Sequence, residues 1–350
     1  MRDDPSLRQL PVAVGGRADQ RGVIATCNYV ARDFGVRSAM ATSQAMQRCP
    51  SLIVIRPSME KYRIASRQIL AIYRDYTELV EPLSLDEAYL DVTHCSQHAG
   101  SATRIAAEIR ARIEATVGIT ASAGIAPNKF VAKIASDWNK PNGQFVVRPH
   151  EVDAFIAALP VKKLFGVGKV TAARLHSLGV HLCADLREWS HVELAKQFGK
   201  FGERLYQLCR GIDERSVNPH RERKSVSVEE TYPSDLSDAR MCAAELDQLI
   251  VTLRARIHRA DAQAIIHKLF IKIRFADFRQ TTVECLASSV DEAMLHTLLR
   301  TGLQRHQQAV RLIGAGVRLQ EDSEVSEEGQ MRLFDRETSV APNPIGDAQV

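Results

Sequence analysis

The feature that most constrains the fold is a change of pattern in the middle of the chain. Residues 151–213 read as short helices only, whereas the residues on both sides alternate between helical and strand patterns. Glycines punctuate this helical segment at Gly166, Gly168, Gly179, Gly199, Gly202 and Gly211. A chain of 350 residues is too long for one compact core. We therefore predict a helical module between two mixed α+β domains.

The first mixed region has the order of elements expected of an α+β domain with helices on one side of its sheet. Residues 1–56 hold short apolar runs and a helix that ends before Pro50. Apolar spacing then predicts helices over 58–76 and 100–114 and a third after Pro127, with strands between and after them. The order becomes a ferredoxin-like βαββαβ unit if one more strand pairs beside the two in residues 82–92.

The second mixed region follows a polar, basic segment at 214–224 that reads as a linker. Strand patterns at 225–232, 267–278, 281–287 and 310–320 alternate with helical patterns around 242–257 and 291–306. We expect a second small α+β domain.

Charge is distributed unevenly along the chain. Residues 161–224 contain 13 Lys/Arg against 7 Asp/Glu, and residues 251–320 contain 11 against 5, so each block has a net charge of +6. Either block alone is compatible with ordinary solvated surface, but two in succession favour a polyanionic partner. Residues 321–350 contain 2 against 8 with little apolar periodicity, which predicts a disordered acidic tail.

Other classes of protein are excluded by the same sequence. No apolar run approaches the roughly 20 residues that span a bilayer, and no signal-peptide pattern is present, so we expect a cytoplasmic protein with no membrane contact. Seven cysteines lie far apart without a C-x-x-C pair, which argues against a zinc site and a disulfide framework. We expect reduced, mostly buried thiols.

Residues 82–92, PLSLDEAYLDV, place Asp86 and Glu87 side by side between two short strand patterns. Neighbouring side chains of a strand point to opposite faces, so two adjacent carboxylates meet one ligand only at a turn or a bulge. Oxygen ligands suit Mg²⁺ or Mn²⁺, and a pair of such ions can clamp an in-line phosphoryl displacement. A charged hairpin turn on the surface is the alternative interpretation.

Residues 164–180, LFGVGKVTAARLHSLGV, resemble a helix-hairpin-helix motif of DNA-binding proteins. Gly166 and Gly168 let the backbone approach a phosphate, and Lys169 adds charge at the helix start. A glycine-capped connection between two helices is the alternative.

Three further features are unremarkable alone: Tyr29 with Arg32 three residues apart, Lys140 beside a turn, and the segment QMRLFD at 330–335 within the acidic tail.

Together these motifs resemble the Y family of translesion DNA polymerases, and within it the bacterial DNA polymerase IV group. The resemblance rests on ATCNYVARDFGVRSAM, EPLSLDEAYLDV, GIAPNKFVAKIASDWNKPNGQ, FGVGKVTAARL, GKFG with RGID, and DFRQTT, and covers about residues 1–320. It implies a multidomain α+β right-hand polymerase. The implied domains are small fingers (1–57), a ferredoxin-like palm lacking its first strand (58–148), a helix-hairpin-helix thumb (149–213), a linker (214–222), an α+β little finger (223–320) and an acidic tail with a clamp-binding motif (321–350).

The resemblance also implies an error-prone, template-directed DNA polymerase that acts in damage tolerance and repair. Asp86 would bridge two Mg²⁺ ions, and Glu87 would help to hold the ion that activates the primer 3′-hydroxyl. The deoxynucleoside triphosphate would be held by Thr26, Tyr29, Arg32 and Lys140. Primer–template DNA would contact Gly166, Gly168, Lys169, Arg279 and Thr281, and the sliding clamp (beta subunit) would bind Gln330, Leu333 and Phe334 of a monomeric enzyme.

One departure from the family sets an alternative. Family members carry an earlier strand with another metal-binding Asp, followed by the aromatic steric gate against ribonucleotides, and this sequence contains neither. We therefore expect the chain as written to extend primers poorly, whether through a late start, as a fragment, or as a short form. The alternative function is a truncated, catalytically impaired protein that binds DNA and the clamp. A helix-hairpin-helix nuclease or glycosylase would explain neither DFRQTT nor the order of the palm elements.

Overall fold

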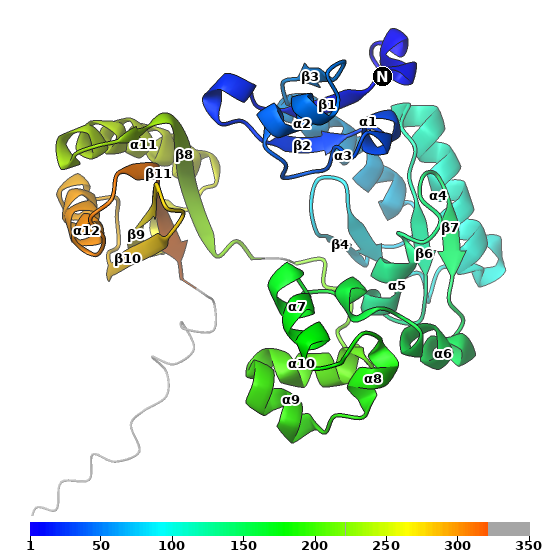
Figure 1. Cartoon of the computed structure of the whole chain (residues 1–350). Helices are drawn as coiled ribbons and strands as arrows, with labels where there is room; N and C mark the ends of the chain where they lie inside the picture. Colours follow the sequence, from blue (N-terminus) through cyan, green and yellow to red (C-terminus); the bar gives the residue numbers. More distant parts are fainter. Residues whose placement is uncertain (221, 321–350) are drawn as a thin grey trace, which may run out of the picture. The chain divides into compact units, whose positions relative to one another are not determined.

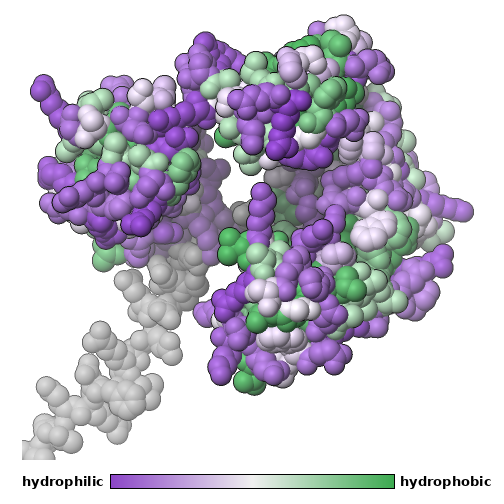
Figure 2. Space-filling model, viewed as in Figure 1, coloured by the Kyte–Doolittle hydropathy of each residue, from purple (hydrophilic) through white to green (hydrophobic). Residues whose placement is uncertain are grey.

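The computed structural model describes residues 1–220 and 222–320, apart from the side chain of residue 264. The chain forms two compact units: Met1–Gly16 with Val23–Arg221, and Arg17–Gly22 with Glu222–Val350. Figure 1 shows the elements of each, and Figure 2 shows hydrophilic residues over most of their visible faces. Within the described part, no helix is long and apolar enough to cross a membrane. All seven cysteines are free thiols, and five of them are buried, as predicted.

The first unit begins with a three-stranded sheet of order β2-β1-β3. β1 (Val12–Gly15) is antiparallel to β2 (Ile24–Cys27) and parallel to β3 (Ile53–Ile55). Two short helices, α1 (Tyr29–Asp33) and α2 (Thr42–Arg48), complete a small core, and a 3-10 turn lies at η1 (Pro5–Gln9). A second 3-10 turn, η2 (Ala18–Gln20), belongs to the segment assigned to the second unit. β3 precedes residue 58 but pairs with β1, so it is not a further strand beside β4 and β5 in residues 80–90.

The next part of the first unit contains the predicted hairpin and its supporting helices. α3 (Met59–Arg74) packs on α4 (Ala102–Val117) through a stripe of buried isoleucines, and η3 (Gln97–Gly100) precedes α4. β4 (Val80–Pro82) and β5 (Ala88–Leu90) form the antiparallel hairpin around residues 83–87. β6 (Ala123–Ile125) is parallel to β7 (Gln144–Val146), with α5 (Lys129–Ala135) between them.

The strands of this part form two separate two-stranded sheets rather than one continuous sheet. Among the described residues, β5 pairs only with β4, and β6 pairs only with β7. Each of the four strands therefore keeps one unpaired edge among the described residues.

The segment 151–213 is wholly helical, as predicted. It contains η4 (Pro149–Glu151), α6 (Val152–Ala157), η5 (Val161–Lys163), α7 (Lys169–Ser177), α8 (Cys183–Arg187), α9 (His191–Phe198) and α10 (Lys200–Leu208). Its buried leucines form one cluster with Phe130, Val131 and Ile134 of α5. A continuous apolar core therefore joins the helical segment to the helix beside the carboxylate hairpin.

The second unit is a four-stranded antiparallel sheet of order β10-β9-β11-β8. Its elements are β8 (Ser225–Leu236), α11 (Ala239–Arg259), η6 (Gln263–Ile265), β9 (Ile266–Phe275), β10 (Gln280–Leu286), α12 (Glu292–Gln304) and β11 (Val310–Leu319). Both helices cover one face of the sheet (Figure 1), and buried residues alternate along β9 because only that face is packed. The predicted second α+β domain is confirmed.

Candidate active site

The turn between β4 and β5 explains how two adjacent carboxylates reach one site. The backbone N–H of Leu83 donates to the carbonyl of Glu87 (2.8 Å), which closes residues 83–87 into a tight turn. The hydroxyl of Ser84 donates to Oδ1 of Asp86 at 2.6 Å. Asp86 and Glu87 are both exposed and both line the same cavity. The turn thus releases the two side chains from the alternation that a regular strand imposes.

This cavity has a volume of about 1290 Å³ and lies within the first unit. Its walls come from α1, α3, α4, α5, β5 and β6. It brings together all six residues predicted from the resemblance to bind metal or triphosphate: Thr26, Tyr29, Arg32, Asp86, Glu87 and Lys140. These residues are spread over more than 100 positions of the sequence, so it is the fold that collects them.

The residues from the first sheet present an aromatic ring and a cation. Asn28 caps α1 by accepting a hydrogen bond from the N–H of Ala31 (3.0 Å), which starts the helix at Tyr29. The guanidinium of Arg32 lies 5.6 Å from the centre of the Tyr29 ring, and its Nε donates to the carbonyl of Cys27 at 3.3 Å. Tyr29 and Arg32 therefore share one face of α1, as a spacing of three residues allows.

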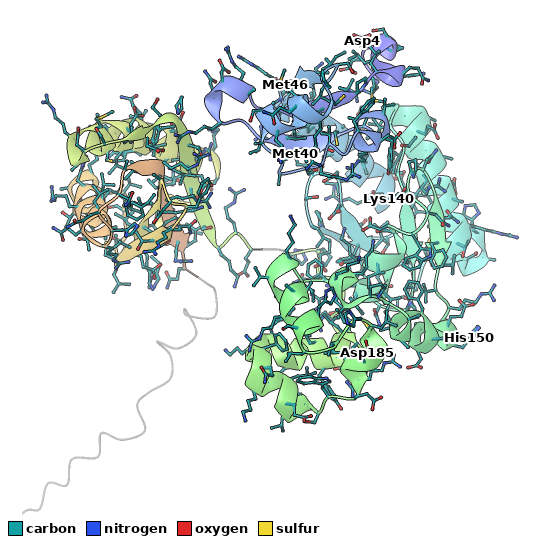
Figure 3. All side chains as sticks on the ribbon, viewed as in Figure 1. Asp4, Met40, Met46, Lys140, His150 and Asp185 are labelled. Atoms are coloured by element: carbon teal, nitrogen blue, oxygen red, sulfur yellow. The ribbon has the colours of Figure 1, made fainter. Side chains whose placement is uncertain are left out.

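Lys140, labelled in Figure 3, lies on the loop between α5 and β7. Its Nζ is 2.5 Å from Oδ1 of Asp137. The loop itself is held by Arg110 of α4, whose guanidinium donates to the carbonyl of Ala121 (2.9 Å) and to Oδ1 of Asn142 (2.9 Å). Sequence reasoning missed Arg110, because a lone arginine in a helical pattern carries no mark of a long-range contact.

Two lysines of α5 also reach the carboxylate hairpin, and neither was predicted. Lys129 Nζ lies 2.6 Å from Oε2 of Glu81 on β4, and Lys133 Nζ lies 2.6 Å from Oε1 of Glu87. The available pattern was their spacing of four residues, which places them one helical turn apart on the same face. No sequence feature identified the partners.

A buried ionic network adjoins the base of the hairpin. Asp213 has a fully buried side chain and accepts hydrogen bonds from Arg204 (3.0 Å), Arg215 (2.7 Å) and the N–H of Phe130 (3.1 Å). Burial alone would raise the pKa of Asp213, but the hydrogen bonds from the two guanidinium groups lower it to about 2. The helical segment is thereby joined to the start of α5.

The pKa of Glu81 is also set by two opposing effects. Burial acts to raise it, while the hydrogen bonds from Lys129 and from the N–H of Asn218 act to lower it, and the net shift is downward. Tyr73 of α3 has a raised pKa, first because it is buried and second because the charge of Asp86 opposes its ionisation. The charge of Asp86 therefore contributes to the raised pKa of a tyrosine in the wall of the cavity.

The predicted DNA-binding residues of the helical segment lie outside the cavity lining. Gly166 has φ +90°, and a Cβ there would meet the ring of Phe201 at 3.0 Å. Gly168 begins α7 with open space where its Cβ would stand, and Lys169 is the first helical residue. The element before this turn is the 3-10 turn η5 rather than the helix expected of the motif.

The second unit holds Arg279 and Thr281. Arg279 lies in the exposed β9–β10 turn, 3.5 Å from Asp277. Thr281 pairs with Ile273, which is buried beneath the helices, and its hydroxyl accepts a hydrogen bond from Arg305 at 2.8 Å. Thr281 therefore points to the helix-covered side, which the sequence could not reveal. The predicted clamp-binding residues Gln330, Leu333 and Phe334 lie outside the described residues.

The donor chemistry at the hairpin fits a hard divalent cation. Asp86 and Glu87 offer carboxylate oxygens only, and they open into a cavity that already contains Arg32 and Lys140 for an anionic ligand. Within residues 1–220 and 222–320, no group of three or more His, Cys, Asp or Glu side chains is placed to hold a metal ion. The hairpin thus supplies two protein ligands, which suits an ion that also binds phosphates and water.

Comparison with known proteins agrees with this geometry. Residues 1–137 match the impB/mucB/samB family, residues 162–213 match the DNA polymerase-iota thumb domain, and residues 223–333 match the impB/mucB/samB family C-terminal domain. A protein of Ralstonia nicotianae named DNA polymerase IV is 60% identical over 321 residues, covering 92% of this chain and 90% of its own length. A protein of Pseudomonas putida strain F1, also named DNA polymerase IV, is 54% identical over 334 residues, covering 95% of this chain and 94% of its own length.

A solved structure shares the fold. A Y-family DNA polymerase chimera, Dbh-Dpo4-Dbh, superimposes with a TM-score of 0.81 at 29% identity, covering 90% of this chain and 93% of its own.

Proposed function

The chain belongs to the Y family of DNA polymerases, the impB/mucB/samB family, and we propose that it is a template-directed DNA polymerase of the translesion type. The observation that carries the proposal is the single cavity lined by Tyr29, Arg32, Asp86, Glu87 and Lys140. It combines two carboxylates at a turn with cations and an aromatic ring that suit a nucleoside triphosphate. The wide, exposed site is consistent with tolerance of damaged templates.

In this mechanism the residues of the chain position two substrates for nucleotidyl transfer. Arg32 binds phosphate oxygens and stacks beside Tyr29, which fixes the direction from which the triphosphate enters. Lys140 exchanges its contact with Asp137 for the more highly charged triphosphate. Asp86 and Glu87 would hold two Mg²⁺ ions, which when bound lower the charge of the phosphates and favour ionisation of the primer 3′-hydroxyl.

Primer–template DNA is bound by backbone and basic groups outside the cavity. The open start of α7 at Gly168, with Lys169 beside it, suits a phosphate of the DNA backbone. In the second unit, the face of the sheet opposite the helices carries Lys268, Lys272 and Arg274, and Arg279 adds charge at the adjacent turn. Such contacts grip DNA without reading its sequence.

The finer partners and boundaries belong to the same proposal. We assign residues 1–57 to the fingers, 58–148 to the palm, 149–213 to the thumb and 223–320 to the little finger. A monomer acting in the cytoplasm would reach the replication site by docking Gln330, Leu333 and Phe334 on the sliding clamp. Double substitution of Leu333 and Phe334 by Ala should abolish clamp binding and leave binding to bare DNA intact.

Primer extension tests the polymerase proposal. The full chain is incubated with a primer–template duplex, the four deoxynucleoside triphosphates and Mg²⁺, and extension is compared with Asp86→Asn and Glu87→Gln. Removing either carboxylate should lower the rate by about 100-fold or more. Asp153→Asn, an exposed carboxylate of the thumb, is the matched control and should extend normally.

A second candidate function is a non-catalytic protein that binds DNA and the clamp. It is favoured by the two basic blocks and by the finding that no group of three or more His, Cys, Asp or Glu side chains is placed to hold a metal ion among the described residues. We expect extension by the unmodified chain to be slow but measurable. Tight, salt-sensitive DNA binding with no detectable extension would support this candidate and refute the polymerase proposal.

A further inference from the structure

The ammonium group of Lys133 forms an ion pair with Glu87 at the tip of the carboxylate hairpin. The Lys133 Nζ lies 2.6 Å from Oε1 of Glu87, and the side chains are 24% and 42% exposed. One turn earlier, Lys129 forms the corresponding contact with Glu81, where the side chains are only 8% and 17% exposed. The same face of α5 therefore contacts the hairpin at its buried base and at its open tip.

The two contacts have different surroundings and so different roles. Lys129 also donates to the carbonyl of Ser216 (2.7 Å), and its ammonium lies 5.5 Å from the centre of the Tyr89 ring. These additional partners fix Lys129 in place. Lys133 has no second acceptor for its ammonium within the described part of the chain, and it reaches into the cavity. Its contact with Glu87 can be exchanged.

The two neighbouring carboxylates, Asp86 and Glu87, differ in whether a cation neutralises their charge. Asp86 accepts a hydrogen bond from the neutral hydroxyl of Ser84, and no cation pairs with it among residues 1–220 and 222–320. Glu87 is paired with Lys133. A divalent ion that approaches Glu87 must therefore share its oxygens with an ammonium group and experience the repulsion of that charge.

We propose that Lys133 is a positioning residue that serves as the resident cation of Glu87 when no metal is bound. It orients the carboxylate before the ion arrives and competes with the ion for it. Metal binding is then weak until a triphosphate offers Lys133 other oxygens. The proposal rests on the proposed function only in taking Glu87 as a metal ligand.

Binding of Mn²⁺ alone to the full chain tests the proposal. Free Mn²⁺ is followed by electron paramagnetic resonance during titration, without DNA or nucleotide. Lys133→Met, which keeps the length of the side chain and removes its charge, should bind Mn²⁺ about fivefold more tightly than the unmodified chain. Lys133→Arg keeps the charge and should bind it as the unmodified chain does.

Two further variants separate competition at Glu87 from a general effect of charge. Lys163→Met removes a charge from the same cavity at a residue that does not pair with Glu87, and should leave the affinity for Mn²⁺ unchanged. In a Glu87→Gln background, Lys133→Met should bring no gain. A gain in that background, or an equal gain from Lys163→Met, would overturn the proposal.

Unchanged or weaker Mn²⁺ binding by folded Lys133→Met would also overturn it. Thermal melting establishes that the variant is folded, and Lys133→Gln, which keeps a polar group but no charge, replaces it if it is not. Because no polymerase assay is involved, absence of primer extension would count against the proposed function and leave this inference standing.

Discussion

Replacement of Asp213 by Asn should destabilise the first unit by about 2.6 kcal/mol at pH 7. The substitution keeps the shape of the side chain and removes its charge, which Arg204 and Arg215 now neutralise at 3.0 and 2.7 Å. The pKa of Asp213 is about 2 in the folded chain, against about 3.9 for an unfolded Asp. Nearly two pH units of preference for the charged form correspond to about 2.6 kcal/mol by linkage.

The same argument fixes the dependence on pH. The folded pKa lies below the unfolded value, so the contribution is complete above about pH 5 and is lost as the pH falls through 4 toward 2. We expect Asp213→Asn to lower the melting temperature by about 5 °C at pH 7 and by about half as much at pH 3. Thermal unfolding followed by circular dichroism at both values measures the difference.

An exposed ion pair of the same segment provides the control. Asp153 pairs with Arg187 at 2.9 Å, but its side chain is 82% exposed. Asp153→Asn should therefore change the melting temperature by no more than about 2 °C. If Asp213→Asn is equally mild at pH 7, or if its effect grows on acidification, the assignment of Asp213 as a buried structural anion is wrong.

Two other substitutions have matched controls within the chain. Arg110→Gln removes the guanidinium that holds loop 140–143 and should weaken nucleotide binding about 10-fold in a fluorescence titration. Arg112→Gln on the same helix is the control and should leave nucleotide binding unchanged. Equal effects of the two substitutions would contradict a role of Arg110 through the loop. Tyr232→Phe should leave the stability of the second unit unchanged or raise it by about 1 kcal/mol in a urea titration, because the buried Tyr232 hydroxyl has no hydrogen-bond partner among the described residues. Tyr76→Phe is the control: it loses a hydrogen bond from Arg112 and should destabilise the first unit in the same urea titration. A clear loss of stability in Tyr232→Phe would refute the expectation for Tyr232.

Local pattern was sufficient to predict most elements of the fold. The isoleucines at helical spacing placed α4, and the short apolar runs on both sides of Asp86 placed the β4–β5 hairpin. The strand pattern at 267–278 likewise predicted β9. These features succeed because periodicity is a property of neighbouring residues, which the sequence displays directly.

The contacts that complete the site were beyond such reasoning. Glu81 and Lys129 are 48 positions apart, and Arg110 and Asn142 are 32 apart, so only the fold brings them together. The face on which Thr281 lies could not be predicted either, because the face that a strand residue occupies depends on which side of the sheet the helices cover. The resemblance to the family predicted the residues of the cavity, but it gave no information about their partners.

The division of β4, β5, β6 and β7 into two separate pairs has a consequence for handling the protein in solution. Among the described residues, β4, β5, β6 and β7 each leave one edge unpaired, and residues of β5 and β6 line the cavity. Backbone donors and acceptors on a free edge recruit any extended chain that can pair with them. In a concentrated preparation, these edges are where self-association would begin.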